Sequence, residues 1–375
     1  MKREVQEFKV TPWEVSGKID YEKLGKEFGI KPMPSLPEIF RENLLFRRKI
    51  IFAQRDFERI LESVKNKKNF VMMTGLMPSG KFHLGHMLIA EQMIFYQKLG
   101  AKLYVTVADL EAYATRQKSM EEMKKIAINE YLINYIALGL SPKNLDFYFQ
   151  SERSKNAKKS NAYYRLASNL SRYATFNEFK AIYGEISPAR INASLLQAAD
   201  MFHPQLPEFE NPIPIVVPVG IDQDPHLRIA RDIAQRYKDN KFIQLSSTYN
   251  LFFPSLKGEG KMSSSDESSF IALTDSPKEV ETKIKKYAFS GGRDTLEEHR
   301  KHGGNPEKDV SFQYLKFFFE PNDAKLKKIH DDYKSGKLLT SELKEILIEK
   351  INSFLKKHQK KRKLAEKQVG KFLMK

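Results

Sequence analysis

Short apolar runs alternate with amphipathic stretches along much of the chain, and this alternation is typical of an α/β protein. Residues 70–73 (Phe-Val-Met-Met) form an apolar run bounded by polar residues, which predicts a buried strand. A loop rich in Gly, Pro and Ser follows, then an expected helix over about 85–99 and a second strand at 103–107. This order of strand, loop, helix and strand describes a βαβ unit and implies a parallel sheet.

Two more strands are predicted at residues 146–149 and 213–217, with helical segments between them. Before them, Ser119 and Glu122 have the spacing of a capping box, and the helix that they begin is expected to end at Gly139. The repeated alternation predicts the fold class as α/β, with a doubly wound, Rossmann-like parallel sheet.

Changes in this pattern divide the chain into three expected parts. Residues 1–65 form an N-terminal extension that ends in a helical stretch over about 37–64. Residues 66–275 form the α/β domain, with a helical insertion at about 115–210. Residues 276–375 are dominated by helical periodicity and charge. We therefore expect a helical C-terminal domain beside the sheet.

The composition fits a soluble globular protein, with 41% apolar and 30% charged residues among 375. The chain contains no cysteine, which excludes disulfides, thiolate catalysis and cysteine-based zinc sites. No apolar run approaches the roughly 20 residues of a membrane span, and no apolar signal core follows the first residues. We therefore expect a cytoplasmic protein without a membrane partner.

The chain is strongly basic, because 64 Lys and Arg residues exceed 47 acidic residues and give a net charge of +17. Residues 356–375 alone contain nine of the basic residues and a single acid, Glu366. Such an excess suggests a polyanionic partner such as nucleic acid. A Lys-rich, solvated surface of a heat-adapted protein would look the same, so charge alone leaves both possibilities open.

A loop with the sequence Pro-Ser-Gly-Lys-Phe-His-Leu-Gly-His follows the first predicted strand. Its glycines let the backbone approach a phosphate or a base closely, and the start of the next helix adds N–H donors and partial positive charge. Its two histidines can donate to phosphate oxygens; their spacing also suits a metal pair or two structural histidines, but no third ligand is evident nearby. We expect nucleotide phosphates to bind here, at Pro78, Ser79, Gly80, His83, Gly85 and His86.

A second loop, at residues 258–267, lies about 175 residues further on and contains Lys-Met-Ser-Ser-Ser between flexible glycines. Lysine followed by serines is usually only a surface loop, but with the first motif it predicts a mobile catalytic loop that neutralises the β and γ phosphates of ATP. In such a split site a carboxylate attacks the α-phosphorus, and positioning and charge stabilisation do most of the work. The predicted ATP contacts of this loop are Lys261, Met262, Ser263, Ser264 and Ser265, and the predicted catalytic residues are His83, His86 and Lys261.

Polar residues also follow the strand that ends near Val219. Gly220, Asp222 and Gln223 come directly after it, at the carboxyl end of a parallel strand, where α/β proteins bind ligands. An Asp-rich turn could instead only cap the next helix. We favour contacts with the ATP ribose and with the substrate.

Gln197 and Asp200 are three residues apart and share one helix face among Ala and Leu. A buried amide and carboxylate need polar partners, and an aromatic amino acid would supply both: a ring N–H or hydroxyl for the acid and an ammonium group for the amide. A neighbouring side chain could satisfy the acid instead. Glu111 is a second candidate partner for the ammonium group, although an ordinary acid at a helix start would look alike. The predicted amino-acid contacts are Thr74, Thr106, Glu111, Gln197, Asp200 and Gln223.

With these motifs in place, the chain resembles the tryptophanyl-tRNA synthetases of the archaeal and eukaryotic type, which are class I aminoacyl-tRNA synthetases. The resemblance includes residues 11–15 (Thr-Pro-Trp-Glu-Val), 46–48 (Phe-Arg-Arg), 221–225 (Ile-Asp-Gln-Asp-Pro) and 290–293 (Ser-Gly-Gly-Arg). It implies activation of tryptophan by ATP with Mg²⁺, transfer to tRNA(Trp), a homodimer, and anticodon binding by the C-terminal helices. It implies neither an organic cofactor nor a structural zinc or other protein-bound metal.

The segment Gln-Ala-Ala-Asp at residues 197–200 is instead similar to bacterial tryptophanyl and to tyrosyl enzymes, in which the Asp receives the polar group of the ring. We therefore expect Asp200 to accept the indole N–H, with Thr106 and Glu111 as secondary pocket residues. A tyrosyl-tRNA synthetase is the close alternative. An adenylyltransferase that acts without tRNA and a silent tRNA-binding paralogue are the more distant ones.

Overall fold

The computed structural model describes residues 9–10, 15–16, 21–115, 118–239, 241–258, 260–264 and 266–373. Its centre is a seven-stranded sheet in the order β3-β4-β9-β8-β5-β6-β7, and the described part of the N-terminal segment adds a separate pair, β1-β2. The strands are β1 Lys9–Val10, β2 Val15–Ser16, β3 Lys31–Pro32, β4 Ile51–Arg55, β5 Val71–Leu76, β6 Lys102–Val107, β7 Leu145–Phe149, β8 Ile215–Gly220 and β9 Ser246–Asn250.

The strand order gives the sheet a topological switch point. The five strands from β9 to β7 pair in parallel, whereas β4 pairs antiparallel with β9, and β3 antiparallel with β4. Numbered along the chain, the parallel strands have the spatial order 3-2-1-4-5, so the winding reverses between β5 and β8. The doubly wound fold predicted from the sequence is confirmed, and such a fold binds ligands where the winding reverses.

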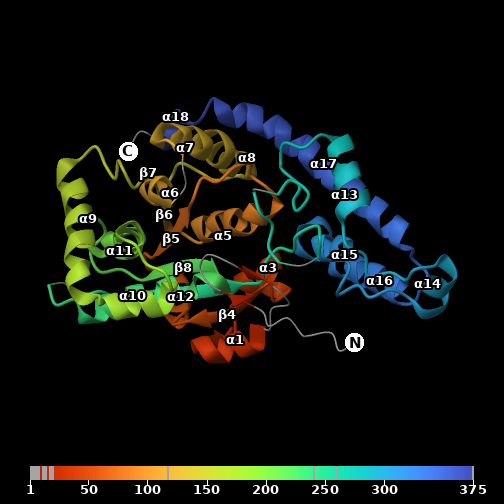
Figure 1. The fold of residues 1–375 in the computed structure, drawn as a ribbon, viewed down its shortest axis with the longest axis horizontal. Helices are drawn as coiled ribbons and strands as arrows, with labels where there is room; N and C mark the ends of the chain where they lie inside the picture. Colours follow the sequence, from red (N-terminus) through yellow and green to blue (C-terminus); the bar gives the residue numbers. More distant parts are fainter. Residues whose placement is uncertain are drawn as a thin grey trace.

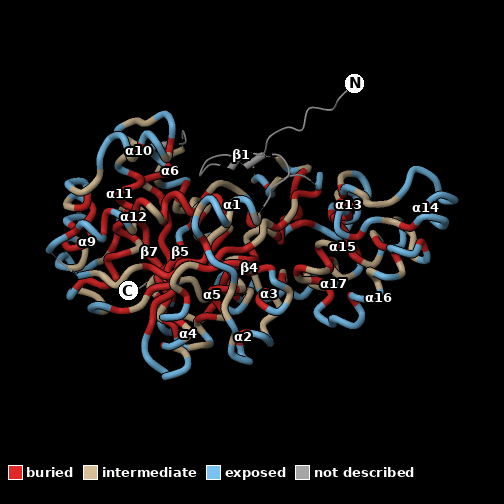
Figure 2. The backbone as a smooth tube through the Cα atoms, turned by 90° about the horizontal axis from the view of Figure 1, so that it is seen from below, coloured by how far each residue is buried: buried red, intermediate tan, exposed pale blue. Residues whose placement is uncertain are grey.

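Alternate residues of each strand face two separate apolar cores. Met72 and Val105 belong to the core under α5, α8 and α17, whereas Met73 and Tyr104 belong to the core under α9, α11 and α12. Figure 1 shows these helices on both sides of the sheet, and Figure 2 shows the buried backbone concentrated between them. The helices of this region are α5 Met87–Lys98, α6 Asp109–Thr115, α7 Met120–Ile126, α8 Ile133–Leu138, α9 Ala157–Leu170, α10 Phe176–Tyr183, α11 Pro188–Phe202 and α12 Asp224–Arg236.

The helix predicted after Ser119 is present but contains an irregular turn. The Ser119 side chain accepts a hydrogen bond from the Glu122 N–H, and Gly139 ends the helix with φ 122°. Between α7 and α8 the residues Ala127–Leu132 form a π-helical turn, η2. Such turns insert an extra residue into a helix and are frequent at functional sites.

The expected helical stretch over residues 37–64 is wrong in its middle. Helices α2 (Glu38–Glu42) and α3 (Leu44–Arg47) are separated from α4 (Glu58–Lys65) by strand β4. Lys49 and Asp56, on either side of the strand, have φ values of 53° and 52°, which a continuous helix does not allow. The predicted N-terminal extension therefore adds β3 and β4 to the edge of the main sheet.

The C-terminal part is helical, as predicted, and its longest helix returns to the α/β part of the fold, where it packs on α8. Helix α17 begins among the C-terminal helices and runs back over α8 (Figure 1). Within the described segments no helix combines the length and apolarity needed to cross a bilayer. The C-terminal helices are α13 Pro277–Tyr287, α14 Leu296–His302, α15 Val310–Tyr314, η6 Leu315–Phe319, α16 Asp323–Lys334, α17 Thr340–Glu366 and α18 Gly370–Leu373.

Candidate active site

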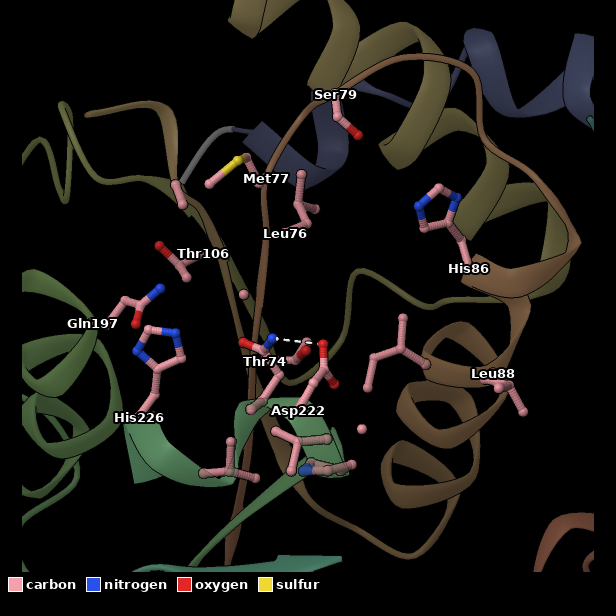
Figure 3. Close-up of a pocket in the computed structure, with 18 of the residues that line it drawn as sticks. Thr74, Leu76, Met77, Ser79, His86, Leu88, Thr106, Gln197, Asp222 and His226 are labelled. Atoms are coloured by element: carbon pink, nitrogen blue, oxygen red, sulfur yellow. Dashed lines mark hydrogen bonds between the residues drawn. The ribbon is translucent and has the colours of Figure 1, made fainter. Parts of the chain in front are cut away.

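A cavity of about 920 Å³ lies at the carboxyl ends of β5 and β8, where the winding of the sheet reverses. Figure 3 shows Gln197 and His226 on one side of it and Ser79 and His86 on the other, with Thr74 and Asp222 between them. Most of the predicted site residues line it. They are Thr74, Ser79, His83, Gly85, His86, Thr106, Glu111, Gln197, Asp200, Gly220, Asp222, Gln223, Lys261, Met262, Ser263 and Ser264. Pro78 and Gly80 lie outside the lining, and Ser265 lies outside the described residues.

The two histidines of the first motif form a stacked pair at the start of helix α5. A short 3-10 turn, Leu84–His86, joins the loop to the helix and holds the ring centroids 3.7 Å apart. The His83 backbone N–H donates to His86 Nδ1 at 3.1 Å. An Nδ1 that accepts a hydrogen bond carries no proton, so the proton of the neutral His86 ring lies on Nε2, which is then a donor.

Burial keeps both imidazoles uncharged at neutral pH. It lowers the pKa of His86 to about 3, and it lowers the pKa of His83 well below its usual value, with the neighbouring His86 as a second cause. Among the described residues, His83 Nδ1 is one of the buried polar atoms without a hydrogen-bond partner. A buried polar atom of this kind at a cavity wall suits a bound ligand.

The two distant motifs touch each other. Ser79 Oγ donates to Ser264 Oγ at 3.3 Å, and a Cβ at Gly80 would lie 3.2 Å from the Ser264 Cβ. A Cβ at Gly85 would lie 3.5 Å from the Met262 sulfur and 3.1 Å from the His83 ring. The lysine loop therefore packs against the first motif through positions where a side chain would intrude.

Backbone pairing extends this contact beyond the lysine loop. The Leu84 N–H donates to the Ile271 carbonyl at 3.0 Å, and the Leu273 N–H donates to the Phe82 carbonyl at 3.0 Å. His83 and Ala272 form an isolated antiparallel bridge between these bonds. The segment that follows the lysine loop is thus joined to the first motif as a short ladder.

Lys261 reaches the third predicted segment. Its Nζ donates to Asp222 Oδ2 at 2.9 Å, and Gln223 Nε2 donates to the same oxygen at 3.0 Å. A Cβ at Gly220 would lie 2.6 Å from Asp222 Oδ1 and 2.7 Å from the Phe252 ring, so only glycine fits there. The three segments predicted to bind ATP therefore meet at one wall of the cavity.

Gln197 and Glu111 meet across the opposite wall. Gln197 Nε2, on α11, donates to Glu111 Oε2, on α6, at 2.9 Å. Glu111 is buried, and Gln197 Oε1 is among the buried acceptors without a partner in the described residues. A carboxylate beside an unpaired amide oxygen can receive a cationic N–H group such as an ammonium.

Asp200 already has three donors. Tyr148 and Tyr163 donate their hydroxyls to its Oδ1 at 2.7 and 2.9 Å, and Gln150 Nε2 donates to its Oδ2 at 2.8 Å. Burial nevertheless raises the pKa of Asp200 to about 6, against these hydrogen bonds. A carboxylate offers about four acceptor positions, so one is left for the indole N–H. Neighbouring side chains therefore do satisfy Asp200, which was the alternative left open by the sequence. The contact with the indole N–H stays a prediction.

Two residues of this wall were not predicted from the sequence. Gln150 directly follows β7 and lines the cavity, and its Oε1 is buried without a partner in the described part of the chain. His226, on α12, also lines the cavity, and its Nδ1 pairs with the Tyr183 hydroxyl at 2.7 Å. Gln150 could have been predicted, because it lies at the carboxyl end of a predicted parallel strand. His226 could not, because its contact with Tyr183 joins two helices that are distant in sequence.

No group of three or more His, Cys, Asp or Glu side chains able to hold a metal ion occurs among the described residues. His83 and His86 therefore lack a third protein ligand within that part of the chain. Their position beside the α5 N-terminus and Lys261 suits an anion better than a cation.

The model of a family described as tRNA synthetases class I (W and Y) matches residues 65–356. The chain is 44% identical over 370 residues to the tryptophan--tRNA ligase of Methanocaldococcus jannaschii, covering 97% of this chain and 98% of that protein. It is 42% identical over 369 residues to the tryptophan--tRNA ligase of Hyperthermus butylicus, covering 96% and 97%. These similarities extend over nearly the full length of each protein.

Solved structures agree with the sequences. The fold is similar to the crystal structure of the tryptophanyl-tRNA synthetase from Aeropyrum pernix, with a TM-score of 0.88, 42% identity and coverage of 94% of this chain and 96% of that one. The corresponding values for the Plasmodium falciparum tryptophanyl-tRNA synthetase are 0.82, 31%, 94% and 95%.

Proposed function

Because the chain belongs to the class I tRNA synthetases for tryptophan and tyrosine, we propose that its cavity activates an amino acid with ATP. The amino acid is L-tryptophan, since relatives that align over nearly the whole chain are tryptophan--tRNA ligases. The product, tryptophanyl-adenylate, then donates its acyl group to tRNA(Trp). The tyrosyl alternative is not favoured by these relatives.

One observation carries the proposal for the site itself. The lysine loop, the His-Leu-Gly-His loop and the turn after β8 meet at the switch point of the sheet, through the contacts of Lys261 with Asp222 and of Ser79 with Ser264. A triphosphate at this wall would lie between a cation, neutral N–H donors and a helix N-terminus. These are the groups that stabilise negative charge as it develops.

The activation step needs no nucleophile from the protein. A carboxylate oxygen of tryptophan forms a bond to the α-phosphorus, and the bond to the bridging oxygen breaks with its electron pair leaving on pyrophosphate. We assign Lys261 and the imidazoles of His83 and His86 to stabilise the negative charge that grows on the leaving group. Each neutral ring keeps one N–H group that can donate a hydrogen bond to a phosphate oxygen.

The two walls of the cavity support the remaining assignments, and Pro78 and Gly80, which lie outside its lining, are assigned with the loop that contains them. We assign Pro78, Ser79, Gly80, Gly85, Gly220, Asp222, Gln223 and the Met-Ser-Ser part of the lysine loop to ATP. Glu111 and Gln197 would hold the α-ammonium group, and Asp200 with Thr106 and Thr74 the indole. The buried, three-donor environment of Asp200 supports selection of a ring that carries one N–H donor.

Four finer assignments belong to the same proposal. Mg²⁺ would enter with ATP and neutralise its phosphates. The C-terminal helices would bind the tRNA anticodon region, which the nine basic residues of segment 356–375 support. A homodimer is expected from the family, and light scattering measures it. A cytoplasmic location follows from the use of charged tRNA by ribosomes, and cell fractionation tests it.

Exchange of labelled pyrophosphate into ATP tests the central step. The purified protein should catalyse exchange with tryptophan at least about 10²-fold better, in kcat/KM, than with tyrosine. Charging of tRNA(Trp) with labelled tryptophan tests the second step. Exchange that prefers tyrosine, or exchange without any charging of tRNA, would contradict the assignment.

A further inference from the structure

One turn of helix α17 contacts the supports of both ATP motifs. The C-terminal half of this helix lies against α8 (Figure 1). His358, Gln359 and Arg362 project from this turn toward the body of the protein, and each has a partner there. Lys360, between them in sequence, is exposed.

The first support is the π-helical turn η2. Its Glu130 accepts a hydrogen bond from the Phe82 N–H at 3.2 Å, inside the His-Leu-Gly-His loop. Its Tyr131 hydroxyl lies 3.4 Å from Ser79 Oγ and 3.5 Å from His86 Nε2. Two consecutive residues of this turn therefore contact the loop.

Helix α17 contacts η2 directly through Arg362 and indirectly through Asn134 of α8. Arg362 donates to the Asn129 carbonyl and lies 3.8 Å from Glu130 Oε1. His358 Nε2 lies 2.7 Å from Asn134 Oδ1, and Asn134 in turn donates to the Glu130 carbonyl. The position of Glu130 therefore depends on α17 through its main chain and its side chain.

The second support is the ladder that follows the lysine loop. Gln359 Nε2 donates to the carbonyls of Leu273 and Asp275 at 3.2 and 3.0 Å. Leu273 pairs through its N–H with the Phe82 carbonyl. The N–H of Phe82 is thus fixed by Glu130 and its carbonyl by Leu273, and both partners are held by the same turn of α17.

We propose that Glu130, Gln359 and Arg362 are positioning residues of the activation step, through which α17 sets the place of the ATP loop. None of the three lines the cavity, so each acts through Phe82 and its neighbours rather than on the nucleotide. This inference rests on the proposed function. It adds that the C-terminal helical region takes part in ATP activation before any tRNA is charged.

Steady-state pyrophosphate exchange without tRNA tests the inference. Glu130→Ala should lower kcat/KM for ATP about tenfold, because the Phe82 N–H loses its acceptor, while KM for tryptophan stays within twofold. Glu130→Gln keeps an amide oxygen for that N–H and should recover most of the loss. Arg362→Gln should lower kcat/KM for ATP about threefold or more.

The matched control is Lys360→Gln, which removes one positive charge from the same turn at an exposed position and should behave as wild type. Active-site titration and thermal unfolding separate positioning from folding. If the variants lose only active fraction or unfolding midpoint, at unchanged KM and kcat per active site, the inference is wrong. It is also wrong if Glu130→Gln is as impaired as Glu130→Ala. Absence of tryptophan-dependent exchange in the wild type would instead refute the proposed function.

Discussion

Lys261 Nζ lies 2.9 Å from Asp222 Oδ2, which joins the lysine loop to the turn after β8 by an ion pair. The Asp222 side chain is only 5% exposed, whereas that of Lys261 is 41% exposed. Phosphates that recruit the lysine must therefore compete with a buried carboxylate. Lys261 should leave Asp222 most readily when the negative charge on the phosphates is largest, which is when pyrophosphate departs. Its stabilising effect is then greatest in the transition state.

Lys261→Ala should lower kcat for tryptophan-dependent exchange by about 10²- to 10³-fold while KM for tryptophan stays within threefold. Stopped-flow and exchange kinetics measure these values. Lys257→Ala is the control, since Lys257 directly precedes the same loop and pairs with Asp266 at 2.7 Å instead. An equal loss of ground-state binding of ATP and tryptophan would remove Lys261 from its assigned role.

Gly220→Ala should raise KM for ATP at least about tenfold, because its Cβ would overlap Asp222 and Phe252 and displace the wall of the cavity. Gly25→Ala is the control, since a Cβ there meets Ile30 at an ordinary 3.6 Å. Isothermal titration with a non-hydrolysable ATP analogue measures the binding. Unchanged affinity in Gly220→Ala would show that this turn does not contact the nucleotide.

The binding of tryptophan should weaken as the pH falls through about 6, since the pKa of Asp200 is raised to about 6 by burial and the indole N–H needs an ionised acceptor. His86 should add no pH dependence to the binding of the ATP analogue over about pH 5–8, because burial lowers its pKa to about 3. Titration across this range measures both. Asp200→Asn should remove the dependence, and its persistence in that variant would assign the titration to another group.

The titration of the Asp200 carboxyl also changes the stability of the fold. Its folded-state pKa lies above the ordinary value of 3.8, so the folded protein binds this proton more tightly than the unfolded chain does. Asp200 therefore reduces the free energy of unfolding as the pH rises from about 4 to 6. Compared with wild type, Asp200→Asn should raise the unfolding midpoint more at pH 7 than at pH 4.5, because its amide carries no charge at either pH.

Leu347→Ala should reduce the free energy of unfolding by about 2–5 kcal/mol, because Leu347 is fully buried in the core under α17. Scanning calorimetry or denaturant titration measures the change. Leu364→Ala on the same helix is the control, since Leu364 is 61% exposed and should change little. Equal effects of the two substitutions would contradict the packing of α17 against the helices that it contacts.

The ATP motifs could be predicted because each consists of consecutive residues, and the first and third directly follow apolar strands. Strand β9 was not predicted, because its sequence Ser-Ser-Thr-Tyr-Asn is polar and only tertiary partners make it a strand. Ser246 donates to the Asp56 carbonyl, and Tyr249 donates to Asp224. The pattern of apolar and polar residues within a short segment does not reveal such distant partners.

The surroundings of Asp200 show the same limit. Its position on an apolar helix face marked it as a site residue, but its donors Tyr148, Gln150 and Tyr163 lie 52, 50 and 37 residues away in sequence. Only the packing of β7 and α9 against α11 brings them together. Spacing within one helix predicts an unsatisfied acid, and the fold then supplies the donors.

During synthesis, strand β4 emerges from the ribosome long before its main partner strand. Beyond the two-residue β3, its partner is β9, which lies about 190 residues further along the chain. At roughly 5–20 residues per second, a ribosome would expose β4 for about 10–40 s before that partner emerges. During this interval Ile51 and its apolar neighbours have no native sheet to join, so they stay exposed until β9 is synthesised.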